Sequence, residues 1–269
     1  TAWLLTGITG IDYVDRGEEG LVDEDDWGYW VKFSYGKFSY GYRWKIPYTG
    51  FYQPFEDSNT GALSAGSMER YYLNEISTRT HTALFVKDIR EDARGAYQYP
   101  EMNTLHCNHG FVYQDNVSSS LKLTDIYLFK NEDYKFLKEH GLSKCYTGDY
   151  DLSHLDNLAA VYDVSDLTHF SYLVDQIRSR QLKRIVFDTN YDLCQKTKNS
   201  IPSASSASLS VVGGGKLTLN SIKVLERNDV QIVPDYKFTY GNNKDYDQDK
   251  VDEYGFYEGD VGVVDHSEG

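Results

Sequence analysis

The sequence predicts a mainly β fold, an irregular array of antiparallel β-hairpins whose sheet is spiral- or shell-like, with two short helical inserts. Aromatic residues are abundant, with 24 Tyr, 12 Phe and 4 Trp among 269 residues, and such side chains favour strands. A short phrase, Leu-x-x-Ile, recurs in strand-like surroundings, and a Tyr- or Phe-rich run follows each occurrence. The five occurrences begin at Leu5, Leu73, Leu123, Leu182 and Leu219.

Each unit is predicted to be an apolar strand, a polar or Gly-rich turn, and an aromatic strand that returns antiparallel. The returning strands are WVKFSYG, HTALFV, YLFK, IVFDTNY and YKFTYG. In the first of them, Val31, Phe33 and Tyr35 share one face because side chains alternate along a strand. In KLTLNSIKVL the apolar positions shift by one residue, which predicts a β-bulge near Asn220–Ser221. The same pattern places Ile222 in the protein core.

A helical insert is predicted within residues 131–181. Residues 131–141, NEDYKFLKEHG, offer Asn131 as an N-cap, apolar residues inside and a glycine after the end. Residues 164–181 carry apolar side chains at helical spacing. Residues 198–216 are rich in Ser, Ala and Gly and are predicted to form a flexible loop. The whole of residues 1–269 is interpreted as a single β-rich segment of a larger chain.

The charge of the chain limits its partners. Lys and Arg total 27 and Asp and Glu total 41, so the formal charge is −14. A polyanion of this size repels nucleic acid and anionic lipid, and we expect no nucleic-acid partner. No apolar run approaches the roughly 18 residues that a membrane span needs. The charge is compatible with a secreted protein and with cation binding.

The acidic stretch DYVDRGEEGLVDEDDWGYW, residues 12–30, lies between two predicted strands. A twelve-residue calcium loop beginning at Asp15 would have a glycine at its turn and carboxylates at several ligand positions. The third position is a glycine without a ligating side chain, and the usual flanking helices are missing. A solvated acidic turn therefore stays open beside the Ca²⁺ site that we predict, whose ligands are Asp15, Glu19, Asp23 and Asp26.

Two further groups of residues are weaker metal candidates. Asp245, Asp247 and Asp249 alternate, so on an extended chain they point the same way. The phrase LHCNHG, residues 105–110, brings two histidines and a cysteine together, but zinc needs further ligands, so the phrase is interpreted as a polar loop rather than a zinc site. The three cysteines lie far apart and predict no disulfide framework.

Aromatic residues offer an alternative function. Exposed rings on strands can stack against sugars, but rings at strand spacing also pack in cores and on sheet faces. A hydrolase is a third class, although paired carboxylates among 41 acids discriminate nothing. The candidate rings are Trp27, Trp30, Trp44, Tyr71 and Tyr72.

Several phrases follow one another in a familiar order. They include WLLTGIT, DDWGYWVKFSYG, RYYLNEISTRTHTALFVKDIRED, LKLTDIYLFKN, GGGKLTLNSIKV and PDYKFTYGNNKDYDQDKVDEYGFY. In these phrases the chain resembles the pre-repeat region of large secreted Bacteroidota proteins that are similar to Rhs/YD-repeat proteins and to the B component of toxin complexes. The usual YD-repeat hairpin signature, a glycine followed by Tyr-Asp, is not present in its regular form in this sequence.

The resemblance implies a long sheet that wraps into a spiral or shell, a secreted or cell-surface location, and a structural or encapsulating role. It also implies that a variable C-terminal module, toxic or not, would carry any chemistry. The implied partners are the remainder of a larger chain, a secretion partner or an encapsulated cargo. We therefore expect a non-enzymatic structural module of a β-sheet shell or scaffold. The competing expectation is a carbohydrate-binding or adhesin-like domain with an exposed aromatic platform.

Overall fold

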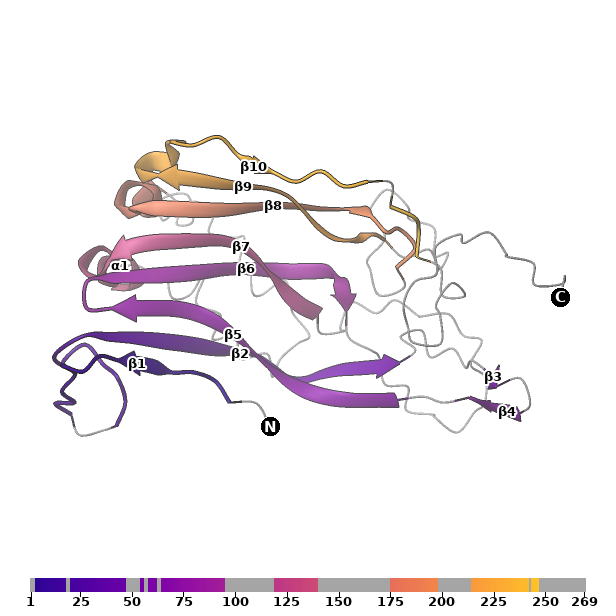
Figure 1. Ribbon diagram of the computed structural model, residues 1–269, viewed down its shortest axis with the longest axis horizontal. Coiled ribbons are helices and arrows are strands. Elements are labelled where there is room, and N and C mark those ends of the chain that lie inside the picture. The colour runs from indigo at the N-terminus through magenta and orange to yellow at the C-terminus, as the bar shows by residue number, and fades with distance from the viewer. Residues whose placement is uncertain are drawn as a thin grey trace, which may run out of the picture.

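The computed structural model describes residues 3–17, 20–46, 54–55, 58–61, 64–94, 119–139, 175–197, 214–241 and 243–246. These residues form one eight-stranded sheet, a separate two-stranded sheet and short helices (Figure 1). The strands are β1 (Gly7–Thr9), β2 (Trp30–Ile46), β3 (Pro54–Phe55), β4 (Ser58–Gly61), β5 (Ser64–Thr78), β6 (His81–Arg94), β7 (Ser119–Lys130), β8 (Lys183–Leu193), β9 (Lys216–Glu226) and β10 (Tyr236–Lys237). The helices are α1 (Asn131–Glu139), the 3₁₀ turn η3 (Arg227–Asp229) and a helical segment at 175–180.

The large sheet follows the order of the chain. Its strands lie in the order β1-β2-β5-β6-β7-β8-β9-β10, and every neighbouring pair is antiparallel. The pair β3–β4 is a small insertion between β2 and β5. The predicted mainly β fold, antiparallel and with two short helical inserts, is confirmed.

One face of the large sheet carries the hydrophobic core, and we call it the helix face. Leu84 and Val86 of β6 and Phe129 of β7 pack there against α1 and the segment 175–180. The helix α1 contributes Tyr134 and Leu137, which lie three residues apart and so on one side of the helix. The segment 175–180 contributes Ile177. Rings stack across this junction, with the Phe129 and Tyr134 centroids 5.8 Å apart.

Polar side chains fasten both helical segments to the sheet. The Asn131 amide donates to the Thr78 carbonyl at 2.8 Å and accepts from the Thr82 hydroxyl at 2.9 Å, so the start of α1 is tied to the β5–β6 turn. Gln181, after the segment 175–180, is fully buried. Its side-chain Nε2 donates to the Glu226 carbonyl and to Asp229, each at 2.9 Å, which joins this segment to η3.

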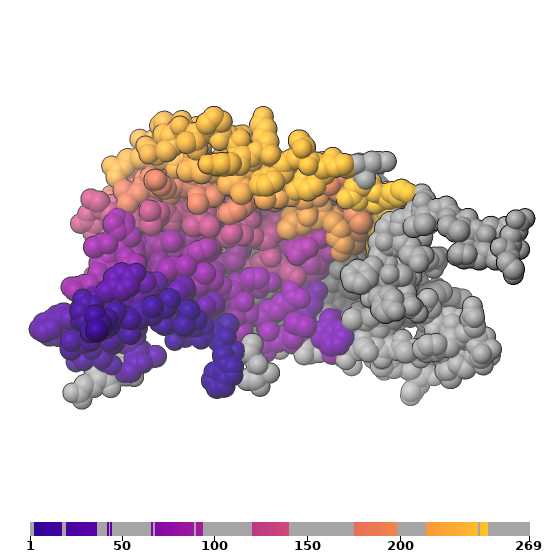
Figure 2. Space-filling view, viewed as in Figure 1, coloured from indigo at the N-terminus to yellow at the C-terminus, as the bar shows by residue number. Residues whose placement is uncertain are grey.

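The opposite side of the sheet, which we call the open face, is apolar as well. Cross-strand neighbours on it include Phe33 with Ile76 and Phe187 with Ile222. Their side chains are only half-buried, because α1 and the segment 175–180 pack on the other face. Figure 2 shows one side of the molecule, on which the described residues follow one another in chain order from indigo to yellow. The open face consists of Ile8, Val31, Phe33, Ile76, Phe85, Ile126, Leu128, Ile185, Phe187, Ile222 and Val224.

The sheet is not uniformly paired along its strands. Neighbours β5 and β6 pair only from Glu75 to Ser77, and β7 and β8 only from Asp125 to Leu128. The pairs β2–β5, β6–β7 and β8–β9 run along most of their strands. Beyond the shared end near the helices, the sheet therefore divides into three two-stranded ribbons (Figure 1).

Several details differ from the sequence-based expectations. The predicted arms LKLTDI and YLFK lie in the single strand β7, and the predicted arm IVFDTNY lies in β8 together with the last four residues of RQLKRIV. Ile222 lies on the open face rather than in the core. The bulge predicted near Asn220 is confirmed, because Asp188 and Thr189 pair with Ser221 and Leu219. Residues 140–174 and 198–213 lie outside the described residues.

Among the described residues, no helix has the length and apolar character that crossing a membrane would require.

Candidate functional site

The acidic stretch forms a hairpin that connects β1 to β2, as predicted. The Val14 and Trp27 backbones exchange hydrogen bonds of 3.0 and 3.1 Å, and the Gly10 N–H donates to the Tyr29 carbonyl at 2.7 Å. Gly20 has a φ of 68°, a left-handed conformation that glycine adopts without strain. We call residues 10–29 the acidic hairpin.

Asp26 organises the interior of the acidic hairpin. The residue is 1% exposed, and its carboxylate accepts the Tyr13 hydroxyl at 2.7 Å, the Asp23 N–H at 2.9 Å and the Arg16 N–H at 3.0 Å. These bonds, that from Asp23 foremost, hold the pKa of Asp26 below its usual value. The same contact raises the pKa of Tyr13 to about 12.

The other predicted calcium ligands also accept backbone hydrogen bonds. Asp15 accepts the Gly20 N–H and Asp23 accepts the Asp25 N–H, each at 2.8 Å. Glu19 lies outside the described residues. Within the part of the chain that the structure describes, no group of three or more His, Cys, Asp or Glu side chains is placed to hold a metal ion. The Ca²⁺ site stays a prediction, and the described carboxylates already stabilise the hairpin backbone.

The weaker metal candidates fall mostly outside the described residues. Asp245 forms an ion pair with Lys196 at 2.9 Å, whereas Asp247 and Asp249 are not described. The LHCNHG phrase at 105–110 is also outside the described ranges.

The five candidate aromatic residues do not share one environment. Trp30 is buried at 2% exposure, and Trp27 is 55% exposed with the Arg16 guanidinium 4.8 Å from its ring centre. Tyr71 and Tyr72 are consecutive on β5, so they point to opposite faces. The Tyr72 hydroxyl accepts the Leu121 N–H at 3.0 Å. These five rings therefore do not form one exposed aromatic platform of the kind considered for a carbohydrate-binding domain.

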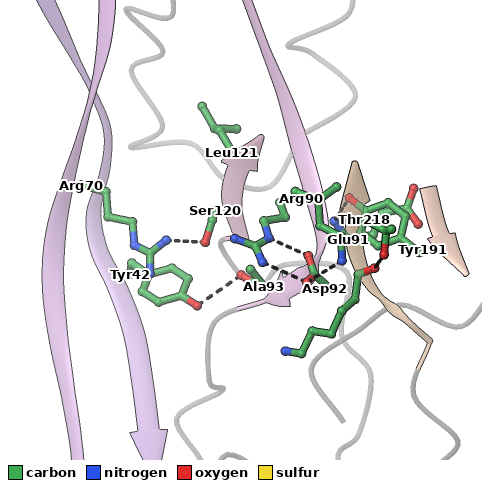
Figure 3. Close-up of polar contacts among 12 residues, drawn as sticks. Tyr42, Arg70, Arg90, Glu91, Asp92, Ala93, Ser120, Leu121, Tyr191 and Thr218 are labelled. Atoms are coloured by element: carbon green, nitrogen blue, oxygen red, sulfur yellow. Dashed lines mark hydrogen bonds and ion pairs between the residues drawn. The ribbon is translucent and has the colours of Figure 1, made fainter. Parts of the chain in front are cut away.

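The structure brings together a polar cluster that sequence analysis missed (Figure 3). It lies where the three ribbons part, and its side chains bond backbone groups of neighbouring ribbons. The Tyr42 hydroxyl of β2 donates to the Ala93 carbonyl of β6 at 3.2 Å, and the Tyr191 hydroxyl of β8 accepts the Glu91 N–H of β6 at 3.0 Å. We call the set the bridging cluster; its members are Tyr42, Arg70, Tyr72, Arg90, Asp92, Ser120 and Tyr191.

Asp92 is the central residue of the bridging cluster. Its side chain is fully buried, and its carboxylate accepts two hydrogen bonds from the Arg90 guanidinium, at 2.6 and 3.0 Å. It also accepts the Leu217 N–H of β9 at 3.0 Å, across 125 residues of sequence. Burial raises the pKa of Asp92, but the hydrogen bonds from Arg90 and Leu217 lower it more, so the pKa lies below its usual value. Asp92 is therefore an ionised carboxylate that joins two ribbons.

Arg70 completes the cluster on the other side. Its guanidinium lies 3.5 Å from the ring centre of Tyr42 and donates to the Ser120 hydroxyl. Burial raises the pKa of Tyr42 and of Tyr191, so both hydroxyls keep their protons at neutral pH. The cluster is thus suited to holding strands together through charge-assisted and neutral hydrogen bonds.

A half-buried lysine, Lys87, lies between β5 and β6. The Lys87 ammonium donates to the Leu73 carbonyl at 2.7 Å, the Asn74 side-chain oxygen at 2.8 Å and the Phe85 carbonyl at 2.7 Å. Burial lowers the pKa of Lys87 to about 8. The three acceptors lie where β5 and β6 have stopped pairing, so Lys87 bridges them.

The arrangement defines a class of protein: an open antiparallel meander with one helix-covered face and side-chain bridges between diverging ribbons. Comparison with protein-family models, with curated proteins and with solved structures found no match.

Proposed function

We propose that the chain is a non-enzymatic structural module that supplies part of a β-sheet shell or scaffold to a larger secreted or cell-surface protein. The observation that carries this proposal is the open face, an apolar sheet surface that extends from β1 to β9. Stable domains bury such a face against a second layer. Here its side chains are only partly buried, except Ile8, which is exposed, so a second layer would bury more apolar surface.

The polar groups described above support the same proposal. Neighbouring strands or helices are joined by the bridging cluster, by Lys87 and by the Asn131 contacts. The polar groups of these contacts form hydrogen bonds with one another or with the backbone. A broad sheet that divides into ribbons needs such connections to hold its curvature. The resemblance to Rhs/YD-repeat proteins supplies the proposed location and the proposed partners: the rest of a larger chain, or an enclosed cargo.

The proposal can be tested with a dye that fluoresces on apolar surfaces, anilinonaphthalene sulfonate. We expect saturable dye binding to the purified chain and weaker binding after Phe187→Thr, which removes a ring from the open face. The matched control is Val186→Thr, one residue earlier on β8 and therefore on the helix face. Circular dichroism of each variant checks that the sheet persists.

Two results would contradict the proposal. One is dye binding that stays unchanged in both variants, which would show that the dye does not bind to the open face. The other is a separate activity. Turnover of a hydrolase substrate that depends on a described carboxylate would favour an enzyme. Glycan binding would favour a carbohydrate-binding domain, and the exposed rings of Tyr236, Phe238 and Tyr240, which alternate along one extended segment, are where we would look for it.

A further inference from the structure

Within the described residues, the first strand of the sheet has an edge without a neighbouring strand. The Phe33 N–H donates to the Thr6 carbonyl at 2.9 Å, and the Gly10 N–H donates to the Tyr29 carbonyl at 2.7 Å. Backbone polar groups in an antiparallel ladder alternate between the two neighbours. Gly7 and Thr9 therefore direct their N–H and C=O groups away from β2, on the side where the described sheet ends.

Exposed apolar side chains surround this free edge. Ile11 and Trp3 are almost fully accessible, at 107% and 93% exposure. Large exposed apolar side chains gather in this part of the chain, and such patches mark interaction sites. The patch consists of Trp3, Leu4, Leu5, Ile8, Ile11, Val14, Leu21, Trp27 and Tyr29.

The charge beside this edge has one sign. Residues 12–26 contain eight carboxylates and a single basic residue, Arg16, whose guanidinium lies against the Trp27 ring. The opposite edge, formed by β10 and its extensions, is mixed: within residues 230–246, Lys237 and Lys244 accompany Asp235 and Asp245. Charge complementarity therefore selects a cationic partner for the β1 edge and not for the β10 edge.

We propose that the β1 edge and the acidic hairpin bind an extended segment of a partner protein in which Lys or Arg alternates with apolar residues. The segment adds to the sheet as a further strand, a recognised mode of peptide binding. A second copy of this chain is a poor occupant, because its own β1 edge carries the same negative charge.

The two sides of β1 explain why the partner sequence should alternate. Ile8 lies on the open-face side, opposite Val31. On the other side the acidic hairpin folds back, since a Cβ built on Gly7 would lie 2.8 Å from the Val22 side chain. A strand added beside β1 would thus direct alternate side chains toward the apolar open face and toward the side of the acidic hairpin, which carries the carboxylates of residues 12–26.

The test measures binding of a fluorescently labelled peptide of alternating Lys and Val by anisotropy. Two control peptides replace every Lys with Glu or insert a Pro at the centre. We expect binding of the first peptide alone, and weaker binding as salt rises, because exposed charge interactions are screened. Equal binding of the Glu peptide, or binding indifferent to salt, would overturn the proposal.

Variants of the chain locate the binding site. Thr9→Pro removes an outward N–H without touching the bonds of Thr6 and Gly10 to β2, and we expect it to weaken binding about tenfold. Ile8→Thr should weaken binding too, whereas the matched control Ile232→Thr, equally exposed near the β10 edge, should not. Circular dichroism checks folding.

Unchanged affinity in both Thr9→Pro and Ile8→Thr would overturn the proposal, as would an equal loss in Ile232→Thr. Sedimentation velocity without peptide adds a second criterion. A self-association that Thr9→Pro abolishes would make a second copy the occupant and would also overturn it. The dye experiment above changes Phe187 of β8, far along the sheet order from β1, whereas the peptide experiment changes Thr9 and Ile8 at β1, so the two proposals can fail independently.

Discussion

The sequence signals the structural roles of some single residues in this protein and gives no sign of others. Asp26 stands out in the sequence itself, because it belongs to a dense acidic stretch between two predicted strands. Its role, accepting three hydrogen bonds inside the acidic hairpin, depends on where the turns fall and could not be predicted. Lys87 gives no sequence signal at all. Its burial follows from the parting of β5 and β6, which only the assembled sheet determines.

Lys87 should give the stability of the protein a distinctive pH dependence. Its pKa falls from an ordinary 10.5 to about 8 on folding, so between these pH values the unfolded chain binds more protons than the folded one. The free energy of unfolding should therefore rise across this window. Urea midpoints of the wild type and of Lys87→Met, measured from pH 7.5 to 10, check this. The rise should be missing in the variant, and a parallel rise in both proteins would contradict the assignment.

At the scale of elements, local patterns predicted which segments form strands better than where the strands end. The bulge at Asn220 and the helix beginning at Asn131 follow from apolar spacing and capping residues within a few positions. The division of β7 and β8 into hairpin arms was wrong, because charged and polar residues within LKLTDIYLFK and LKRIVFDTNY resemble turns. They remain in strands because neighbouring strands continue to pair with them. The bridging cluster joins residues up to 125 positions apart, beyond any local pattern.

The bridging cluster should contribute measurably to the joining of the ribbons. Asp92→Asn keeps the size of the side chain but leaves the Arg90 guanidinium without its carboxylate. We expect a loss of about 2 kcal/mol in the free energy of unfolding, as for a buried polar group that loses its partner. Arg90 is partly exposed, which limits the cost. The amide of Leu217, whose N–H donates to Asp92, should exchange hydrogen faster in the variant. Unchanged exchange at Leu217 would contradict the role of the cluster in joining the ribbons.

At the scale of the whole molecule, the sheet has two apolar faces of which the described helices cover one. Sequence periodicity separates the two faces of each strand, since Leu84 and Val86 alternate with Phe85. It cannot say which face receives a helix, because that depends on the path the chain takes after β7 and before β8. For this reason Ile222 was predicted in the core and lies on the open face instead.

The difference between the faces should appear in a pair of substitutions on one strand. Leu84→Ala opens a cavity beneath the helices and should lower the free energy of unfolding by about 3 kcal/mol. Phe85→Ala removes a larger side chain from the half-buried open face and should cost about half as much. Chemical denaturation of both variants checks this order. A larger loss for Phe85→Ala would show that the open face is covered in the isolated chain.

The agreement between strand order and chain order has a consequence for how the protein acquires its structure. Among the described strands, none has to enter between two strands that paired earlier, so each new strand adds to the side that was completed last. Pairing between consecutive segments also keeps loop closure short, which lowers its entropic cost. The sheet can therefore assemble progressively, from β1 onward, while the polypeptide is still emerging from the ribosome.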